Sequence, residues 1–456
     1  MRGTALVLAV GLIPAALGAQ GFGVYELSTC TMARGGAVAA NPCGDGSAVF
    51  FNPAGLSSLS GTHFSAGLTT ISPTGGFTDD VFLQHTGMTS QTFVVPNFFV
   101  THRLNEKIGL GLGFYVPYGL GTKWPLSFAG RFAGYDTQVK SYYIQPTISY
   151  QVTPRLSFGL GVAYVHASVA LHQHLDLSQQ LVPTAITGPA GLPAGLTFAQ
   201  VGIPTNTDFA NADLSASGNG IAFNGGVIFK VNDQLTLGGH FLTRKTIHFT
   251  GNASFQEIKT GLVLYAPPLI NSPLPLDAVL PSEFASGGPL SGSAATTDVT
   301  LPDQGSIGFD YKINDQWHFS GDYQMVVWGW FNQLTVNFAN AGTPPLSDYE
   351  GYKDSNGFRL GTEYAYSPKL TFRGGYVFNT AAAPDQTVTP RLPEGSRNSF
   401  ILGVGYQLTS GLHGDASVMY LKQNDRRGRV SEVSTLNTGL YTFKAVLLGA
   451  GLSYTF

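Results

Sequence analysis

The chain ends in Val446-Leu-Leu-Gly-Ala-Gly-Leu-Ser-Tyr-Thr-Phe456, and this stretch decides the fold. Every second residue back from Phe456 is apolar or aromatic, whereas the intervening residues are small or polar apart from Leu447. A period of two with two unlike faces indicates a β-strand that has a different environment on each side. With an aromatic residue at the chain end, the pattern is typical of the closing strand of a membrane β-barrel, although a strand of a soluble sandwich also alternates.

The composition favours the membrane barrel. Only 11% of the 456 residues are charged, against about 25% in ordinary soluble domains. Mean hydropathy is only +0.09, because the apolar residues are spread along the chain. No run long enough for a helical span follows the N-terminus. The net charge of −3, without a long basic block, argues against nucleic acid as a partner.

Residues 1–19 have the features of an export signal. Arg2 supplies the cation, residues 5–16 form an apolar core, and the small residues Gly18 and Ala19 close the segment. We expect cleavage after Gly18 or Ala19. The alternative is a retained membrane anchor, for which the apolar run is short. Export combined with a barrel pattern predicts the bacterial outer membrane.

Six short turn-forming segments organise the rest of the chain. Asn, Asp, Pro or Gly occupies their centres, and alternating residues flank them on both sides. They are residues 103–108, 151–156, 230–235, 312–317, 366–370 and 408–412. Six hairpins give twelve strands. One strand before them, at about Thr62–Ile71, and one after them, at about Tyr441–Phe456, make fourteen, an even number as in single-chain bacterial barrels.

Longer segments rich in Gly, Pro, Ser, Asn and Thr separate the hairpins: 73–90, 121–138, 174–217, 252–298, 333–354, 380–397 and 424–440. Short turns on one rim and long loops on the other are typical of membrane barrels, with the short turns and both termini on the periplasmic side. We therefore predict an all-β fold in which residues 61–456 form a 14-stranded antiparallel transmembrane β-barrel.

Residues 20–60 precede the first strand and do not alternate. A fourteen-stranded lumen is too wide for side chains alone to fill, so we expect this segment to form an N-terminal hatch inside it. The alternative is a loose periplasmic tail, in which Phe50 and Phe51 would be poorly solvated. Cys30 and Cys43 could form a disulfide in the oxidising periplasm or remain two buried thiols, and the sequence leaves both open.

Two segments of the expected hatch resemble the FadL family of outer-membrane transporters: Gly21-Phe-Gly-Val-Tyr-Glu-Leu-Ser28 and the Asn-Pro-Ala motif in Phe51-Asn-Pro-Ala-Gly-Leu56. Further segments that look like the family are 118–120, 301–302, 351–354 and 415–420. The resemblance implies passive uptake of long-chain fatty acids or, in TodX-like members, of aromatic hydrocarbons. It implies that ligand collected at the extracellular loops passes to an apolar pocket under the hatch and leaves sideways at a kinked third strand.

Two prolines give such a lateral gap a physical basis. Pro96 falls in the second strand and Pro117 in the third, and proline has no N–H for a ladder. If the turn near Asn105 pairs these strands, Pro96 lies opposite about Phe114, close to Pro117, and a bulge or kink results. The alternative is two independent bulges without a transport role. The predicted gate consists of Pro96, Pro117, Tyr118 and Gly119.

The ligand pocket is expected to be apolar with few polar anchors. The candidates are Phe22, Val24, Asn52 and Pro53 from the hatch, Tyr115 and Val116 from the third strand, and His172 and His174 from the fifth. Asn52 has an alternative role, because Asn before Pro can bond backbone and start a turn. The family's fatty-acid members hold the carboxylate with basic side chains, yet no Lys or Arg occurs from Leu156 to Phe229. This departure somewhat favours neutral hydrocarbons.

Other expectations concern the surface. Trp124, Trp317, Trp328 and Trp330 are expected in the aromatic girdles at the membrane interfaces. The basic run Arg426-Arg427-Gly-Arg429 is expected to contact anionic lipopolysaccharide or to be solvated. The expected partners are therefore hydrophobic small molecules, outer-membrane lipid and lipopolysaccharide, with the chain as a monomer.

Three rival functions remain open at this point. A general diffusion porin needs an open channel, which a hatch would block, and a structural or adhesive barrel would take up nothing. An outer-membrane enzyme is disfavoured, because the chain has no Gly-x-Ser-x-Gly and no Ser-His-Asp or paired-carboxylate set with recognisable spacing. We expect no catalytic residues, no cofactor and no metal. The sequence does not decide between a fatty acid and a neutral hydrocarbon as ligand.

Overall fold

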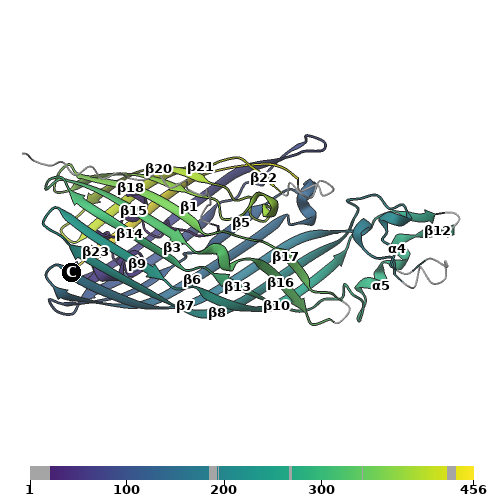
Figure 1. Cartoon of the computed structure of the whole chain (residues 1–456), viewed down its shortest axis with the longest axis horizontal. Coiled ribbons are helices and arrows are strands. Elements are labelled where there is room, and N and C mark those ends of the chain that lie inside the picture. The colour runs from purple at the N-terminus through teal and green to yellow at the C-terminus, as the bar shows by residue number, and fades with distance from the viewer. Residues whose placement is uncertain (1–20, 184–192, 194, 267–269, 341–342, 429–437) are drawn as a thin grey trace, which may run out of the picture.

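Fourteen antiparallel wall strands close into a barrel in the computed structural model (Figure 1), which describes residues 21–183, 193, 195–266, 270–340, 343–428 and 438–456. Each wall strand pairs with its neighbours in the sequence. The ring is closed by β1 (Thr62–Asp79) and β23 (Gly439–Thr455), which pair along their whole length. The predicted fold class is confirmed.

The wall strands between β1 and β23 are β3 (Phe93–Arg103), β4 (Ile108–Tyr115) continued by β5 (Gly119–Lys123), β6 (Asp136–Thr153), β7 (Leu156–Asp176), β8 (Asp208–Lys230), β9 (Leu235–Leu242) continued by β10 (Lys245–Glu257), β13 (Ser293–Leu301) continued by β14 (Gln304–Lys312), β15 (Trp317–Val326) continued by β16 (Gln333–Phe338), β18 (Ser355–Ala365), β19 (Leu370–Asn379), β20 (Arg397–Gln407) and β21 (Leu412–Gln423). The six predicted hairpins are all present, as β3–β4, β6–β7, β8–β9, β14–β15, β18–β19 and β20–β21.

Shorter elements lie between the wall strands at the long-loop end. They are β2 (His85–Gly87), η2 (Ala129–Phe132), η3 (Leu177–Gln179), η4 (Ala199–Val201), β11 (Val263–Ala266), β12 (Ile270–Pro275), α4 (Leu276–Val279), α5 (Pro281–Phe284), η5 (Trp328–Trp330), β17 (Leu346–Tyr349), η6 (Asp385–Thr387) and β22 (Arg426–Gly428). In Figure 1, α4, α5 and β12 extend beyond the barrel on the right, opposite the end where the chain terminates.

Several strands run farther than predicted. β1 continues to Asp79, where the sequence predicts a loop from residue 73, and β7 and β8 extend into the predicted loop 174–217. The prediction ended these strands where their apolar residues become sparse. The ladder does not need apolar side chains, because its bonds are between backbone groups. The barrel wall therefore extends past its apolar belt.

The outward-facing row of the closing strands is apolar, as the C-terminal stretch indicates. Leu68 on β1 is 44% exposed and Leu448 and Leu452 on β23 are 54% and 55% exposed, whereas inward-facing Thr69 is buried. Large exposed apolar side chains form a belt that suits lipid in a barrel. Among the described residues, no helix is long and apolar enough to cross a bilayer.

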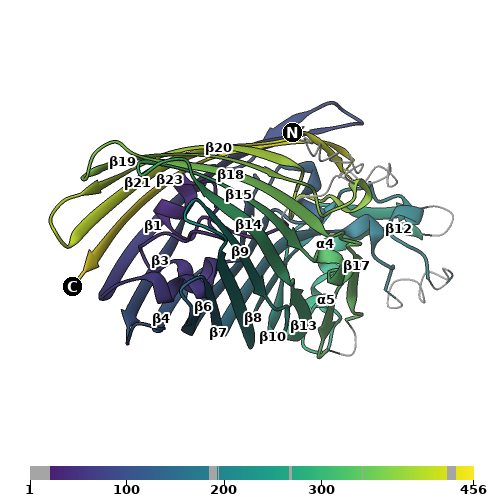
Figure 2. The same ribbon diagram turned by 60° about the vertical axis from the view of Figure 1, so that its left-hand side comes forward.

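Residues 21–60, here called the N-terminal segment, are almost entirely buried up to Ser57. They contain α1 (Thr29–Ala33), α2 (Ala48–Phe51) and η1 (Pro53–Ser58), and Figure 2 shows these purple helices within the ring of strands. Cys30 and Cys43 form a disulfide, which resolves the choice that the sequence leaves open. The segment is thus a compact, cross-linked unit.

Inward-facing polar side chains of the wall hold the N-terminal segment. Asn224 on β8 donates to the Phe50 carbonyl at 2.9 Å. One carboxylate oxygen of Asp322 on β15 accepts the backbone N–H groups of Val38 and Ala39, both at 2.9 Å. Because a segment without regular structure has many free backbone groups, these wall side chains stabilise it where no ladder can.

Candidate functional site

The third wall strand is interrupted. β4 ends at Tyr115 and β5 begins at Gly119, and both pair with β6. The β3–β4 ladder ends at the pair Phe98–Phe114, so residues 93–97 of β3 pair with β1 alone. No ladder therefore joins β3 to β5, and the wall is open between them at the level of the kink.

Backbone groups of the kink bond to the N-terminal segment. The N–H of Val24 donates to the Pro117 carbonyl at 2.8 Å, and the N–H of Gly119 donates to the Phe22 carbonyl at 2.9 Å. These bonds satisfy polar groups that the broken ladder leaves without partners. Residues 22–24 thus pair with the kink like a short inner strand. We therefore expect a movement of the N-terminal segment to be passed on to the kink.

The predicted register around this gap is off by two residues. Phe114 faces Phe98 and not Pro96. The β3–β4 hairpin is centred on Glu106 rather than on Asn105, because an Asn side chain that bonds the following backbone N–H groups sets the turn. Pro96 still lies in the part of β3 that has no partner on the β5 side.

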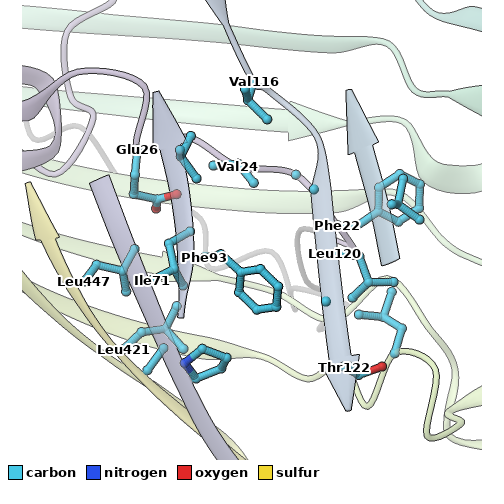
Figure 3. Close-up of a pocket in the computed structure, with 18 of the residues that line it drawn as sticks. Phe22, Val24, Glu26, Ile71, Phe93, Val116, Leu120, Thr122, Leu421 and Leu447 are labelled. Carbon is cyan, nitrogen blue, oxygen red and sulfur yellow. The ribbon is translucent and has the colours of Figure 1, made fainter. Parts of the chain in front are cut away.

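A cavity of about 400 Å³, here called the kink cavity, lies at this gap (Figure 3). Its apolar lining comes from all around the gap and includes Phe22, Val24, Ile71, Phe93, Pro96, Val116, Leu120, Leu421 and Leu447. Glu26, Lys140, Glu394 and Arg397 are its charged lining residues. An apolar cavity with few polar groups suits a hydrophobic ligand.

A second cavity of about 120 Å³, here called the upper cavity, lies toward the long-loop end. It shares Phe22, Leu120, Val139 and Leu392 with the kink cavity. The Phe22 ring lies 4.6 Å from that of Trp328 and 6.2 Å from that of Tyr118, in edge-to-face arrangements. Phe22 therefore stands between two apolar compartments.

The charged lining residues of the upper cavity are Arg391 and Glu350, both buried, and sequence reasoning missed both. The Nη2 of Arg391 pairs with Asp348, while Nε and Nη1 are buried without a hydrogen-bond partner among the described residues. Burial alone would lower the pKa of Arg391, but the Asp348 and Glu350 carboxylates raise it, so the side chain stays charged. Burial raises the pKa of the nearby Tyr352 phenol well above its usual value and keeps it neutral. Two guanidinium nitrogens without a hydrogen-bond partner among the described residues suit an anionic head group.

Of the predicted pocket residues, the structure brings Phe22, Val24 and Val116 together at the kink cavity. Asn52 and Pro53 lie outside the lining of both cavities. The Asn52 amide donates to the Ala39 carbonyl at 2.6 Å and to the Val227 carbonyl at 3.0 Å. Asn52 Oδ1 also accepts the Ala54 N–H at 3.1 Å and caps η1, which is the structural alternative that the sequence raises.

Tyr115, another predicted pocket residue, is also outside both linings. It is fully buried, and its hydroxyl donates to the Gln145 side chain at 2.5 Å. Of the predicted gate residues, Pro96 and Gly119 line the kink cavity. Tyr118 is buried with its hydroxyl bonded to the Pro302 carbonyl at 3.1 Å.

His172 and His174 do not face either cavity. The Nδ1 of His172 lies 2.5 Å from Asp213, and that of His174 lies 2.9 Å from Asp208. Arg131 also pairs with Asp208, at 2.8 Å. These ion pairs therefore connect β7, β8 and η2.

Two of the four tryptophans are not in an interfacial girdle. Trp317 and Trp330 are 45% and 52% exposed, as a girdle requires, but Trp124 and Trp328 are buried inside the barrel. The indole N–H of Trp124 donates to the Pro390 carbonyl at 3.1 Å. Both interior rings occur in segments without alternation, so no periodicity shows which way they point.

The comparisons with known proteins agree with this geometry. A family model described as "Outer membrane protein transport protein (OMPP1/FadL/TodX)" matches residues 11–456. The chain is 25% identical over 470 residues to the long-chain fatty acid transport protein of Escherichia coli (strain K12), which covers 99% of this chain and 98% of the relative. It is 23% identical over 487 residues to outer membrane protein P1 of Haemophilus influenzae, with the same shares covered.

Solved structures show the same fold. A Pseudomonas aeruginosa FadL homologue has a TM-score of 0.80 at 20% identity, covering 96% of this chain and 100% of that one. The Ralstonia pickettii toluene transporter TbuX has a TM-score of 0.66 at 22% identity, covering 95% and 100%. The family match over nearly the whole chain leads to one conclusion: this protein belongs to the OMPP1/FadL/TodX family of outer-membrane transport proteins.

Proposed function

We propose that the protein takes up hydrophobic molecules passively across the outer membrane, through the upper cavity, past Phe22 and out through the gap between β3 and β5. The observation that carries this proposal is the kink cavity, which lies where the β3–β4 ladder stops and is lined by both banks of the gap. Relatives are named as transporters of long-chain fatty acids and of toluene, which are both apolar cargo. The rival function of a general porin is not favoured, since the interior is occupied by buried protein.

The ligand class that the upper cavity supports is an apolar chain with an anionic head. Its lining is largely aliphatic and aromatic, with Arg391 and Glu350 as its charged residues. Nε and Nη1 of Arg391 are buried without a hydrogen-bond partner among the described residues, and the paired Asp348 leaves them available to an anionic head group. The absence of Lys and Arg from residues 156–229 favoured neutral hydrocarbons, but the cation comes from the 380–396 loop instead. A long-chain carboxylate is therefore the proposed cargo.

The remaining roles in the proposal follow from the same geometry. Residues 20–60 serve as the hatch, residues 1–19 as the export signal, and residues 61–456 as the barrel. Pro96, Pro117, Tyr118 and Gly119 form the gate. Transport needs no covalent chemistry, and the protein acts as a monomer in lipid and lipopolysaccharide. Arg426 pairs with Asp385, and Arg427 pairs with Asp80. Any contact of these two arginines with lipopolysaccharide would therefore involve side chains that are already ion-paired. Arg429 lies outside the described residues.

Filling the gap tests the proposal. Gly119→Trp places an indole in the kink cavity, and a Cβ there meets only ordinary contacts, 3.5 Å from Val24 and 3.8 Å from Val139. We expect uptake of a radiolabelled long-chain fatty acid by cells to fall by at least about tenfold, since the exit route is blocked. Binding to the purified protein is expected to persist.

Gly87→Trp is the matched control, because Gly87 is exposed in β2 and has open space around its Cβ position. It is expected to leave uptake unchanged. Full uptake by a folded Gly119→Trp protein would rule out exit through this gap.

A further inference from the structure

The wall has a second interruption, six strands around the barrel from the first. Val326 on β15 still pairs with Gln304, but β16 rejoins β13 only at the pair Val336–Thr297. Between these points residues 327–335, which include η5, leave the ladder. No ladder pair joins them to residues 298–302 of the neighbouring strand. Pro302 lies in this stretch and has no N–H to donate.

A missing ladder does not by itself mean a separable seam. Residues 218–223 of β8 and 244–249 also have no ladder pairs between them. There, however, the backbones touch, because a Cβ at Gly218 would lie 2.3 Å from the His248 carbonyl oxygen. The break beside η5 differs, since apolar side chains line a cavity from both of its banks.

That cavity is the upper cavity. Val299 and Leu301 of β13 line it on one bank of the break, and Phe331, Leu334 and Val336 line it on the other. A side-chain contact between two unpaired strands can open by rotamer changes, without breaking backbone hydrogen bonds. The upper cavity is therefore separated from the outside here by side chains.

On the outer surface, one pair of side chains spans the break. Trp330 of η5 is 52% exposed, and the Arg244 guanidinium carbon lies 3.9 Å from its ring centroid. Arg244 is fixed to the opposite bank, where its backbone N–H donates to Asp303 at 2.7 Å and its Nη1 lies 3.6 Å from the same carboxylate. The Trp330 side chain therefore covers the break on its outer face, and a cation–π contact with Arg244 holds it there. We call it the Trp330 lid.

The break lies at the upper border of the apolar belt. Below it, Tyr323 and Met325 of β15 are 37% and 39% exposed on the outer face. At its upper end, the exposed His248 and Asp298 side chains form an outward pair at 2.8 Å. Such a border, with Trp and Arg side chains, is the level of the membrane interface, where the head of an amphipathic molecule resides.

We propose that this break is a second lateral portal, through which a hydrocarbon chain dissolved in the outer leaflet enters the upper cavity beneath the Trp330 lid. The inference rests on the proposed transport function and adds an entrance from the membrane to the route. Tyr118 connects the two breaks, because its backbone lies in the kink and its hydroxyl donates to the Pro302 carbonyl at 3.1 Å. Cargo thus enters through one seam and leaves through the other.

Two substitutions change the portal in opposite directions. Trp330→Ala removes the lid, and we expect faster initial uptake of a fatty acid preloaded in the outer leaflet. Thr300→Trp adds bulk on the outer face of β13, where Thr300 bonds outward-facing Thr246 at 2.8 Å, and is expected to slow that uptake. Trp317→Ala is the matched control, because Trp317 is a 45% exposed tryptophan at the other end of β15.

Photolabelling of the unchanged protein gives a readout that does not depend on the variants folding. A fatty acid with a diazirine at mid-chain is dissolved in the bilayer. It is expected to label peptides covering 298–302 and 328–335 more strongly than the lipid-facing peptide 412–421. Binding of free ligand from water is expected to be equal in all three variants.

The portal would be overturned if fatty acid delivered from the membrane were taken up at the same rate by Trp330→Ala, Thr300→Trp and the wild type. It would also be overturned if Trp317→Ala changed that rate as much as Trp330→Ala does. Labelling of the two peptides at the background level would overturn it as well. The proposed function fails separately, if the wild type takes up no fatty acid by any route or if Gly119→Trp leaves uptake intact.

Discussion

Arg391→Met is expected to weaken binding of a long-chain fatty acid by about ten- to a hundredfold, because hydrogen bonds to a charged group contribute about 1.5–3 kcal/mol each. Nε and Nη1 of the wild-type side chain are buried beside the upper cavity without a hydrogen-bond partner among the described residues, and the expected loss corresponds to one charged hydrogen bond to the carboxylate. Methionine keeps the apolar volume and removes the charge. Binding of toluene or a long alkane is expected to be unchanged. Calorimetric titration of the purified protein measures both.

Two controls separate a head-group role from a structural one. Arg426→Met removes another arginine of the same rim, paired with Asp385, that lines neither cavity, and is expected to leave both affinities unchanged. The double variant Arg391→Met, Asp348→Asn removes the carboxylate that the single variant leaves unpaired. Equal losses for fatty acid and alkane in the double variant would show that Arg391 only supports the fold of the loop.

Arg34→Met is expected to loosen the N-terminal segment from the wall and to give the barrel a measurable ion conductance. Arg34 is buried, and its Nη2 lies 3.3 Å from Asp310 and donates to Ser320 at 2.9 Å. Breaking a buried ion pair costs up to about 3–5 kcal/mol. Asp310 keeps His318 at 2.9 Å and Ser320 at 2.6 Å, so we expect a loss toward the low end of that range. Single-channel recording in planar bilayers measures the current, and hydrogen exchange of peptides 29–44 measures the local loosening.

Arg155→Met is the matched control for this loosening. Arg155 is exposed in the turn between β6 and β7, so its loss is expected to change neither the current nor the exchange. If the Arg34→Met protein shows no ion current and exchanges hydrogen in residues 29–44 as slowly as the wild type, the disulfide and the remaining hydrogen bonds are enough to hold the segment.

The barrel could be predicted from sequence because its two signals are local. Alternation along a strand such as 446–456 and turn residues such as those of 230–235 depend on neighbours only, so the strand number and the hairpins were correct. Strand lengths were underestimated, because a wall strand above the lipid belt keeps its ladder while its side chains become polar on both faces. The ends of β7 and β8 show this most clearly.

The candidate site was predictable only where the backbone itself carries the signal. Two prolines in strands indicated the gap, and both flank it in the structure, although the register was off by two residues. Arg391 and Trp328 had no such signal. They belong to segments without periodicity, so only the tertiary contacts decide that one lines a cavity and the other packs against Phe22. The sequence also could not show that His172 and His174 pair with Asp213 and Asp208 outside both cavities, because these carboxylates lie far along the chain.

The cross-link between Cys30 and Cys43 has a consequence for biogenesis. Both residues are about 5% exposed or less, enclosed by the finished wall, and no oxidant of protein size can reach them there. We therefore expect the bond to form while the exported chain is still in the periplasm, before the first and last strands meet. In that order oxidation precedes insertion, and the leading part of the polypeptide arrives at the membrane already looped.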